Sequence, residues 1–293
     1  MRQPTRDALV AGGLDPAYVE GVVRTALEED LGGPGGVDVT SAATIPADQT
    51  GTADLVARAS GVVAGLAVAA AVFEACGCVF AARVPDGAAV HRGDVLATVD
   101  GPTRGLLTAE RTALNLISRM SGVATHTRRW VDALAGTGAT VLDTRKTTPG
   151  LRALEKYAVR AAGGDNKRMG LYDVAMIKDN HRLAAGSITA AYRAVREQFP
   201  DVAVQVEVES VAEAVEAVEA GAVFLLCDNM PPAALRDVVA AVGGKAELEA
   251  TGNLTLETVA DYAATGVDYL SVGGLTHSSP ILDIALDLRE GTP

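Results

Sequence analysis

The feature that most constrains the fold is an alternation of short apolar runs with Ala-rich segments in the second half of the chain. The apolar runs have the length of buried strands and comprise Ala139–Leu142, Val174–Ile177, Val202–Val208, Val223–Leu226, Ala246–Leu248 and Tyr269–Val272. Between most of them lie segments with helical periodicity, namely Ile188–Phe199, Val211–Ala220, Pro232–Val242 and Leu256–Thr265. Buried strands that alternate with helices predict βαβ units and a parallel sheet. The later strands recur about every 20 residues, which is the tight spacing expected of a (β/α) barrel.

The first part of the chain has a different texture. A helix predicted over Ala17–Asp30 is followed by a Gly- and Pro-rich loop at Gly32–Gly36. The segment Gly51–Ala57, a helix predicted over Leu66–Cys76 and the turn-bearing stretch Asp86–Asp100 come next. This mixture predicts a small α/β layer in which helices cover an open sheet.

The boundary between the two parts lies in a long helix predicted over Thr108–Trp130. We place it near residue 115, which gives an N-terminal α/β domain over residues 1–115 and a barrel domain over residues 116–275. Pro280 and an apolar segment, Ile281–Leu288, which we predict to be helical, follow the last barrel strand. We therefore expect a C-terminal tail, about residues 276–293, to leave the barrel and pack on the first domain.

Composition argues against several classes of function. The formal net charge is −12, and aromatic residues make up only 4% of the chain. We expect no nucleic-acid partner, because such binding needs a broad basic face or aromatic stacking platforms. The apolar run Gly61–Val79 contains Glu74 and fits a buried helix better than a membrane span. The N-terminus lacks the apolar core of a signal peptide and the three cysteines lack zinc-ligand spacing, so we expect a cytoplasmic location and reduced thiols.

A basic cluster lies between Val141 and His181 of this acidic chain. It comprises Arg145, Lys146, Arg152, Lys156, Arg160, Lys167, Arg168 and Lys178. Such a cluster indicates a pocket for a small anion. For Arg152, Lys156 and Arg160 we favour the plainer interpretation of solvated charges, because a spacing of four places them on one helix face, where Glu155 can also pair.

Polar residues stand at the carboxyl ends of the predicted strands. In a parallel barrel these ends all face one common mouth. In chain order they are Asp143-Thr144-Arg145-Lys146, Lys178-Asp179-Asn180, Glu207, Asp228-Asn229, Thr251-Gly252-Asn253 and Gly273-Gly274. Cations come first, carboxylates follow and small residues come last. Gly-containing loops can bind phosphate through backbone N–H groups, so the last two loops predict a phosphate site. A plain tight turn stays the alternative for each loop taken alone.

Glu207 and Asp228 are candidate ligands for Mg²⁺, bound partly through water and substrate phosphates, because this ion prefers hard oxygen ligands. Period-two alternation in the strand places Glu209 on the same face as Glu207. The alternative for Glu207 is a salt bridge to a barrel lysine or arginine, because a buried carboxylate needs a partner. No Walker sequence, Gly-x-Ser-x-Gly motif or dinucleotide fingerprint follows a strand, so acyl transfer and nicotinamide-dependent redox chemistry lack support.

The motifs also resemble a known family. DTRKTTPGLRALEKYAV, NKRMGL, IKDNH, VQVEVES, LLCDNM, LEATGN and DYLSVGGLTHS follow one another, after ARASGVVAGL and LLTAERTALNLISRMSGVAT. Over nearly the whole chain they closely resemble the quinolinate phosphoribosyltransferases, or carboxylating nicotinate-nucleotide pyrophosphorylases. The resemblance implies an open α/β sandwich packed on an incomplete (β/α) barrel. It also implies a homodimer and a reaction of quinolinate with 5-phosphoribosyl-1-pyrophosphate (PRPP), giving nicotinate mononucleotide, pyrophosphate and CO₂ in NAD biosynthesis.

The resemblance also implies roles for individual residues. Arg145, Arg168 and Lys178 match residues that hold the quinolinate carboxylates, and Arg111 matches an arginine supplied to the active site of the neighbouring subunit. Lys146 matches a lysine near the substrates, and the acidic pair at the ribose and magnesium corresponds to Glu207 and Asp228. We assign Lys146, Glu207 and Asp228 as catalytic. The substrate-binding assignments are Arg111, Thr144, Arg145, Lys167, Arg168, Lys178, Thr251, Gly252, Asn253, Gly273 and Gly274. Whether the assembly stops at a dimer or continues to a hexamer stays open.

Three departures from the family pattern concern the site. Lys167 stands where the family usually has histidine, which retains positive charge but loses the planar imidazole. Asp165 stands in a turn that usually holds three glycines. Asn253 occupies a position often held by Gly, so we predict a left-handed backbone there, which Asn tolerates better than most residues. Two alternatives follow: a paralogous phosphoribosyltransferase that acts on another pyridine or ring carboxylate, and a binding protein that kept the fold without turnover.

Overall fold

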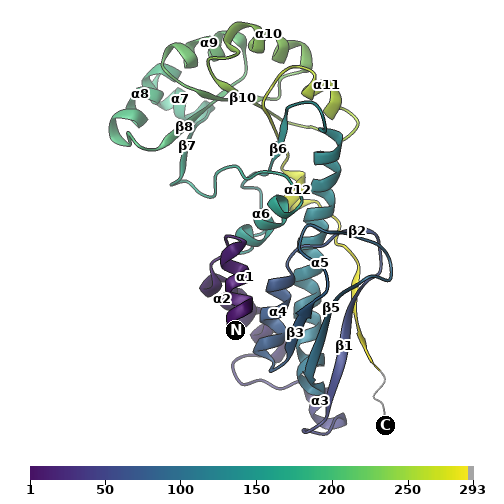
Figure 1. Ribbon diagram of the computed structural model, residues 1–293. Helices are drawn as coiled ribbons and strands as arrows, with labels where there is room; N and C mark the ends of the chain where they lie inside the picture. Colours follow the sequence, from purple (N-terminus) through teal and green to yellow (C-terminus); the bar gives the residue numbers. More distant parts are fainter. Residues whose placement is uncertain (290–293) are drawn as a thin grey trace. The chain divides into compact units, whose positions relative to one another are not determined.

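Residues 1–289 are described by a computed structural model, in which the chain forms two compact units (Figure 1). The first unit comprises Met1–His126, Thr148–Gly163 and the segment from Ser278 onward. The second unit comprises Thr127–Thr147 and Gly164–His277. Among the described residues, no helix is both long enough and apolar enough to span a bilayer.

An antiparallel sheet forms the centre of the first unit. Its four strands have the order β12-β1-β5-β3, with bounds Ile284–Leu288, Thr50–Ala57, Val95–Pro102 and Val79–Ala82. A separate two-stranded ribbon pairs β2 (Gly61–Val62) with β4 (Ala89–Val90). The helices are α1 (Gln3–Ala11), α2 (Pro16–Leu31), α3 (Val39–Thr44), α4 (Leu66–Ala75), the first part of α5 (Thr103–Ala133) and α6 (Arg152–Ala161).

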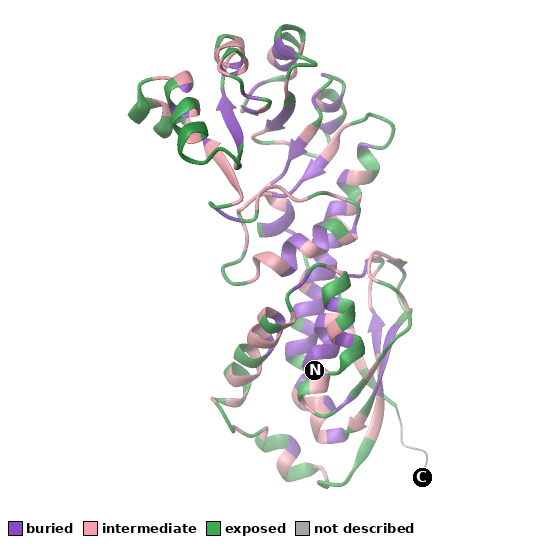
Figure 2. Cartoon of the chain, turned by 60° about the vertical axis from the view of Figure 1, so that its left-hand side comes forward, coloured by how far each residue is buried: buried purple, intermediate pink, exposed green. Residues whose placement is uncertain are grey.

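Local sequence explains where these helices begin and end. The helix α2 begins after Asp15, whose carboxylate accepts a hydrogen bond from the Ala17 N–H, and Pro16 is at its first position. It ends at Gly32, which has a left-handed backbone with φ 78°. Helix α4 contributes mainly small aliphatic side chains to the core of the unit, such as Val68 and Val72 among alanines, together with the aromatic ring of Phe73. Figure 2 shows buried positions gathered along α5 and the strands.

The prediction of a helix over Ile281–Leu288 is wrong, because Ile284–Leu288 forms strand β12. This strand pairs antiparallel with β1, from Ala57 opposite Ile284 to Ala53 opposite Leu288. Five apolar or alternating residues are too few to favour a helix. The edge of β1 offers a row of backbone groups that need hydrogen-bonding partners. Tertiary pairing therefore overrides the local pattern.

The second unit contains a parallel sheet of six strands, and its helices are α7 to α12. The strand order is β6-β11-β10-β9-β8-β7, with bounds Thr140–Leu142, Tyr269–Ser271, Glu247–Thr251, Phe224–Asp228, Ala203–Val208 and Val174–Ile177. The helices are α7 (Asp179–Ala185), α8 (Ile188–Gln198), α9 (Val211–Glu219), α10 (Pro232–Val242), α11 (Val259–Ala263) and α12 (Gly274–His277). The predicted α/β class, with a parallel βαβ sheet and a separate N-terminal sheet, is confirmed.

Capping residues fix the helices that connect these strands. The side chains of Ser187 and Ser210 accept hydrogen bonds from backbone N–H groups in the first turns of α8 and α9. Gly221 follows α9 and has φ 105°, a backbone conformation that residues other than Gly rarely adopt. These short connections return the chain to the start of the next parallel strand, so the carboxyl ends of all the strands lie along one edge of the sheet.

Candidate active site

The carboxyl-terminal edge of the parallel sheet carries most of the predicted site residues. The following predicted residues belong to the second unit and lie in or directly after its strands, or in the loop before β7: Thr144, Arg145, Lys146, Lys167, Arg168, Lys178, Glu207, Asp228, Thr251, Gly252, Asn253, Gly273 and Gly274. Arg111 belongs to the first unit, where it is exposed on α5.

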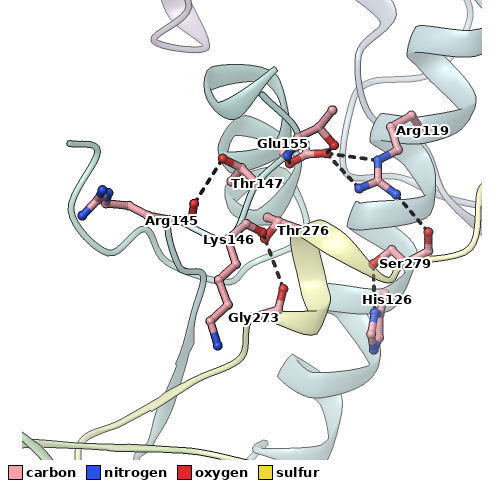
Figure 3. A network of polar contacts seen from close by, with 10 residues as sticks. Arg119, His126, Arg145, Lys146, Thr147, Glu155, Gly273, Thr276 and Ser279 are labelled. Atoms are coloured by element: carbon pink, nitrogen blue, oxygen red, sulfur yellow. Dashed lines mark hydrogen bonds and ion pairs between the residues drawn. The ribbon is translucent and has the colours of Figure 1, made fainter. Parts of the chain in front are cut away.

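The loop after β6 presents Arg145 and Lys146. The Lys146 N–H donates to Thr144 Oγ1 at 3.1 Å, and Thr276 Oγ1 donates to the Lys146 carbonyl oxygen at 2.8 Å. The two long side chains extend from the loop in different directions (Figure 3). A Cβ atom at Gly273 would lie 3.0 Å from Lys146 Cδ, so glycine leaves room for this side chain. The loops after β6 and β11 are therefore joined by a hydrogen bond and fit closely.

Two guanidinium groups act on each other electrostatically within this edge. Burial lowers the pKa of Arg168, and the positive charge of Arg145 lowers that pKa further. Arg168 Nη1 also donates to the Val174 carbonyl oxygen at 3.0 Å. Like charges that are held close together and partly desolvated form a ready site for an anion. The two arginines are brought together as an anion pocket requires.

Lys167 is next to this arginine in the chain, and most of its side chain is covered. Its Nζ donates to Glu249 Oε1 at 2.6 Å, and its side chain is only 10% exposed. Gln205 Nε2 donates to the second oxygen of Glu249, also at 2.6 Å. Burial lowers the pKa of Lys167, and the charge of Glu249 opposes that shift. The cation assigned from sequence to the carboxylate pocket thus has a carboxylate of the protein as its partner.

The segment that carries Arg168 is held from both sides. Asp143, which is fully buried, accepts hydrogen bonds from Asn166 Nδ2 at 2.6 Å and from the Lys167 N–H at 2.9 Å. On the other side of Arg168, Asp173 accepts hydrogen bonds from the N–H groups of Met169 at 2.5 Å and Gly170 at 3.0 Å. Burial acts to raise the pKa of Asp173, but hydrogen bonds from backbone N–H groups, including these two, outweigh it and lower the pKa.

Glu207 forms an ion pair with Lys178 at the edge of the sheet. The side chain of Lys178 is 43% exposed, and that of Glu207 is 9% exposed. In the register of β8 and β9, Glu207 lies opposite Leu226, so Asp228, two residues further, is on the same face of the sheet. Among the described residues, no group of three or more His, Cys, Asp or Glu side chains could hold a metal ion. Two same-face carboxylates nevertheless fit a Mg²⁺ ion that takes its other ligands from water and substrate phosphates.

Two asparagines at this edge have unusual backbone conformations. Among the described residues, only Asn229 and Asn253 combine a side chain with positive φ, at 52° and 50° respectively. The left-handed backbone predicted for Asn253 is confirmed. Gly252 has φ 99°, and a Cβ there would lie 2.1 Å from Asn229 Oδ1, so both the backbone and the space favour glycine. The Asn229 N–H donates to the Thr251 carbonyl oxygen at 2.9 Å. Such conformations gather where a backbone must face a ligand.

Sequence reasoning missed Glu249, Gln205 and Asp173. Glu249 precedes Thr251 by two residues in LEATGN and is completely buried. A signal for it was present, because a carboxylate in a buried strand needs a cationic partner. The identity of that partner was hidden, because Lys167 lies 82 residues away in the chain.

In the first unit, α6 is more buried than expected. Lys156 is only 1% exposed and Glu155 is fully buried, so the prediction that Lys156 is a solvated helix charge is wrong. Glu155 accepts a hydrogen bond from Arg119 Nη2 at 2.8 Å (Figure 3). It also accepts from the Thr148 N–H and hydroxyl at 3.0 and 2.7 Å. The helix therefore carries internal charges, with their own partners, on the face that packs inside its unit.

Two family models match the chain in succession. The quinolinate phosphoribosyl transferase N-terminal domain matches residues 38–121, and the C-terminal domain of the same name matches residues 123–287. The chain belongs to the quinolinate phosphoribosyl transferase family. The order of the two domain models agrees with a sheet unit followed by a parallel βαβ unit.

Individual members of the family are similar over most of their length. The nicotinate-nucleotide pyrophosphorylase [carboxylating] of Mycobacterium leprae is 50% identical, over 91% of this chain and 95% of its own. A probable enzyme of the same name from Bacillus subtilis is 43% identical, over 86% and 88%. The crystal structure of NadC from Streptococcus pyogenes is similar, with a TM-score of 0.89 and 37% identity, over 94% of this chain and 99% of that one.

Proposed function

We propose that this chain transfers the phosphoribosyl group of PRPP to quinolinate and releases pyrophosphate and CO₂, giving nicotinate mononucleotide for NAD biosynthesis. The observation that carries the proposal is the pair Arg145 and Arg168, two guanidinium groups held close enough to lower a pKa. A planar dicarboxylate is the ligand that two such groups bind best, because each can form a bidentate, charge-assisted contact. The family relatives named above support the same activity.

The first task of the site is to orient the acid. Arg145, Arg168 and Lys178 bind its two carboxylates and direct the ring nitrogen towards the anomeric carbon of the donor. Holding both reactants in this geometry removes much of the entropic cost of a reaction between two molecules. The ring nitrogen then forms a bond to the anomeric carbon as the bond from that carbon to pyrophosphate breaks.

The second task is to bind the donor and stabilise its charge. The loops Thr251–Asn253 and Gly273–Gly274 bind the 5-phosphate through backbone N–H groups. Glu207 and Asp228 would hold Mg²⁺, partly through water, where the ion would neutralise charge on the pyrophosphate group. Both carboxylates also face the ribose, whose anomeric carbon develops positive charge, and Lys146 balances the leaving group. The side-chain charges are thus arranged with opposite signs around the bond that breaks.

Loss of CO₂ follows without a covalent bond to the protein. The ring nitrogen becomes cationic once the glycosidic bond has formed. The bond between the adjacent ring carbon and its carboxylate then breaks, and its electron pair stays on that ring carbon beside the positive nitrogen. A proton from solvent replaces the lost carboxyl group.

The same proposal covers assembly and location. We infer a homodimer, in which Arg111 of one copy is supplied to the active site of the other, and a cytoplasmic location. The exposure of Arg111 on α5 supports the first inference, because an exposed cation is available to a second subunit. Mixing an Arg111→Ala variant with an Arg168→Ala variant tests it, since each mixed dimer would contain one intact site and would regain activity.

The deciding experiment for the reaction is a steady-state assay with PRPP and Mg²⁺. Production of CO₂ and mononucleotide is followed from quinolinate, with nicotinate in a parallel reaction. Efficient turnover of quinolinate with little from nicotinate is expected. Turnover of nicotinate or another ring acid in its place would restrict the conclusion to phosphoribosyl transfer.

A further inference from the structure

We propose that Glu249 is a positioning residue, which holds Lys167 beneath the carboxyl edge of the parallel sheet and thereby presents Arg168, and not Lys167, to the acid substrate. The inference rests on the proposed function and deepens it, because it identifies which of two adjacent cations recognises the acid. The motif LEATGN contains Glu249, but the resemblance assigned no role to this residue or to its contact with Lys167.

Burial and geometry make this pair a fixed one. Glu249 is on β10, in the middle of the parallel sheet, and is fully buried. Both of its oxygens are bound at 2.6 Å, one by Lys167 Nζ and the other by Gln205 Nε2. Gln205 is itself fully buried on β8. The carboxylate therefore has one charged and one neutral donor, both inside the unit.

The Lys167 ammonium has three N–H donors and gives one to Glu249, but its side chain is only 10% exposed, so an acid at the mouth would have to draw it outward, away from Glu249, to form a full contact. That exchange would leave a fully buried carboxylate without its counter-ion, and the cost of an uncompensated buried charge exceeds the gain of a new contact at the mouth. Lys167 would also gain little, because it already has a partner at hydrogen-bonding distance. The pair should therefore remain intact throughout turnover.

The backbone around Arg168 explains what the pair achieves. The Lys167 N–H is bound by buried Asp143, its ammonium by Glu249, and the Met169 N–H by Asp173. The residues on either side of Arg168 are thus anchored at three points. Its own guanidinium is partly exposed and acts electrostatically on Arg145. A side chain whose neighbours are fixed can bind a carboxylate in one orientation with a small loss of entropy.

A double-mutant cycle tests the proposal with Glu249→Gln, Lys167→Gln and the combination of both. KM for quinolinate, KM for PRPP, kcat and the unfolding midpoint are measured for each. Glu249→Gln strands a buried lysine, so KM for quinolinate should rise roughly tenfold while KM for PRPP changes less than about twofold. The double variant replaces the ion pair by two amides that can bond to each other, and should return KM for quinolinate to within about threefold of the original.

Two outcomes would overturn the proposal. If the double variant keeps a KM for quinolinate as high as that of Arg168→Gln, Lys167 binds the acid directly. If Glu249→Gln lowers the unfolding midpoint and raises both KM values equally, the pair has only a structural role. Should Glu249→Gln fail to fold, the double variant, which buries no charge there, still decides between direct binding and positioning. Glu247→Gln is the matched control, because it makes the same change at an exposed site on the same strand and should leave both KM values unchanged.

A spectroscopic titration separates this inference from the proposed function. The chain has five lysines, so the side-chain ammonium signals are few enough to assign by substitution. Quinolinate should shift the signal of Lys178 and leave that of Lys167 in place. A large shift of the Lys167 signal would contradict the positioning role. If quinolinate shifts no signal and is not turned over, the proposed function fails. Even then, a comparison of the Lys167 signal in the original chain with the Lys167 signal in Glu249→Gln reports whether the pair exists.

Discussion

Two lysine–glutamate pairs lie in the second unit, and they differ mainly in depth. In the pair of Lys167 with Glu249 the side chains are 10% and 0% exposed, whereas in the pair of Lys178 with Glu207 they are 43% and 9% exposed. The deeper pair cannot dissociate without leaving a charge in an apolar interior. The outer pair can exchange partners, because water screens Lys178 when it leaves. The same chemistry thus gives a fixed support in one place and an adjustable contact in the other.

The largest expected effect breaks the deeper pair. Glu249→Ala should lower the free energy of unfolding by about 3–5 kcal/mol, because it leaves Lys167 buried without its counter-ion. Glu207→Ala should lower it by only about 1 kcal/mol, since Lys178 can turn to solvent. Urea denaturation followed by circular dichroism measures both. Equal losses would mean that depth does not distinguish the pairs.

A second prediction concerns the two arginines assigned to the acid, Arg168 and Arg145, and is read from KM for each substrate. Arg168→Ala or Arg145→Ala should raise KM for quinolinate by about 30-fold or more, the loss expected when one partner of a charge-assisted contact is removed. KM for PRPP should change little. Steady-state kinetics with each substrate varied in turn provides the check. Equal losses for both substrates would refute the assignment of these arginines to the acid.

A third prediction concerns the outer pair. Lys178→Gln should change the free energy of unfolding by less than about 1 kcal/mol, because the lysine is substantially exposed. Turnover should nevertheless fall about tenfold or more, because Lys178 binds a substrate carboxylate in the proposed reaction. Thermal unfolding and kcat/KM are measured on the same preparation. A variant that loses stability and activity in proportion would show that the outer pair is structural too.

The smallest effect is a dependence of stability on pH. The pKa of Lys167 is lowered in the folded chain, mainly by burial. At pH values between that lowered pKa and the ordinary value of about 10.4, the unfolded chain therefore binds more protons than the folded chain. Stability should therefore rise with pH across this window, by at most about 1.4 kcal/mol per pH unit. The rise is obtained by subtracting the free energy of unfolding of Lys167→Gln from that of the original chain at each pH. This subtraction removes the contribution of the cysteines, which both chains contain. A difference that does not change with pH would contradict it.

The sequence was most informative where local pattern and tertiary structure agree. The strands of the parallel sheet were predictable because both of their faces are buried and their apolar runs are continuous. The positive φ of Asn253 was predictable because a position usually held by Gly restricts the backbone. The common carboxyl edge of the parallel strands then followed from the rule that parallel strands end together. The gathering of the candidate residues along one edge of the sheet was therefore predictable from the sequence.

The sequence was least informative where a partner is distant. Ile284–Leu288 was predicted as helix because nothing in those residues reveals the edge of β1, which pairs with them. Lys156 was predicted to be solvated because i,i+4 spacing does not show which helix face is covered. Glu249 carried a signal of burial, yet its pairing with Lys167 depends on the register of strands and loops far apart in the chain. Such contacts arise only from the assembled fold.

The pairing of β12 with β1 also has a consequence for how the chain is made. A ribosome releases β1 before the second unit and β12 after it, so the sheet of the first unit lacks one of its strands until the second unit has been made. The second unit, which lies between these strands in the sequence, is complete by then. During that interval the edge of β1 is open to pairing with a foreign strand. The order of synthesis therefore makes the first unit to emerge the last one to finish folding.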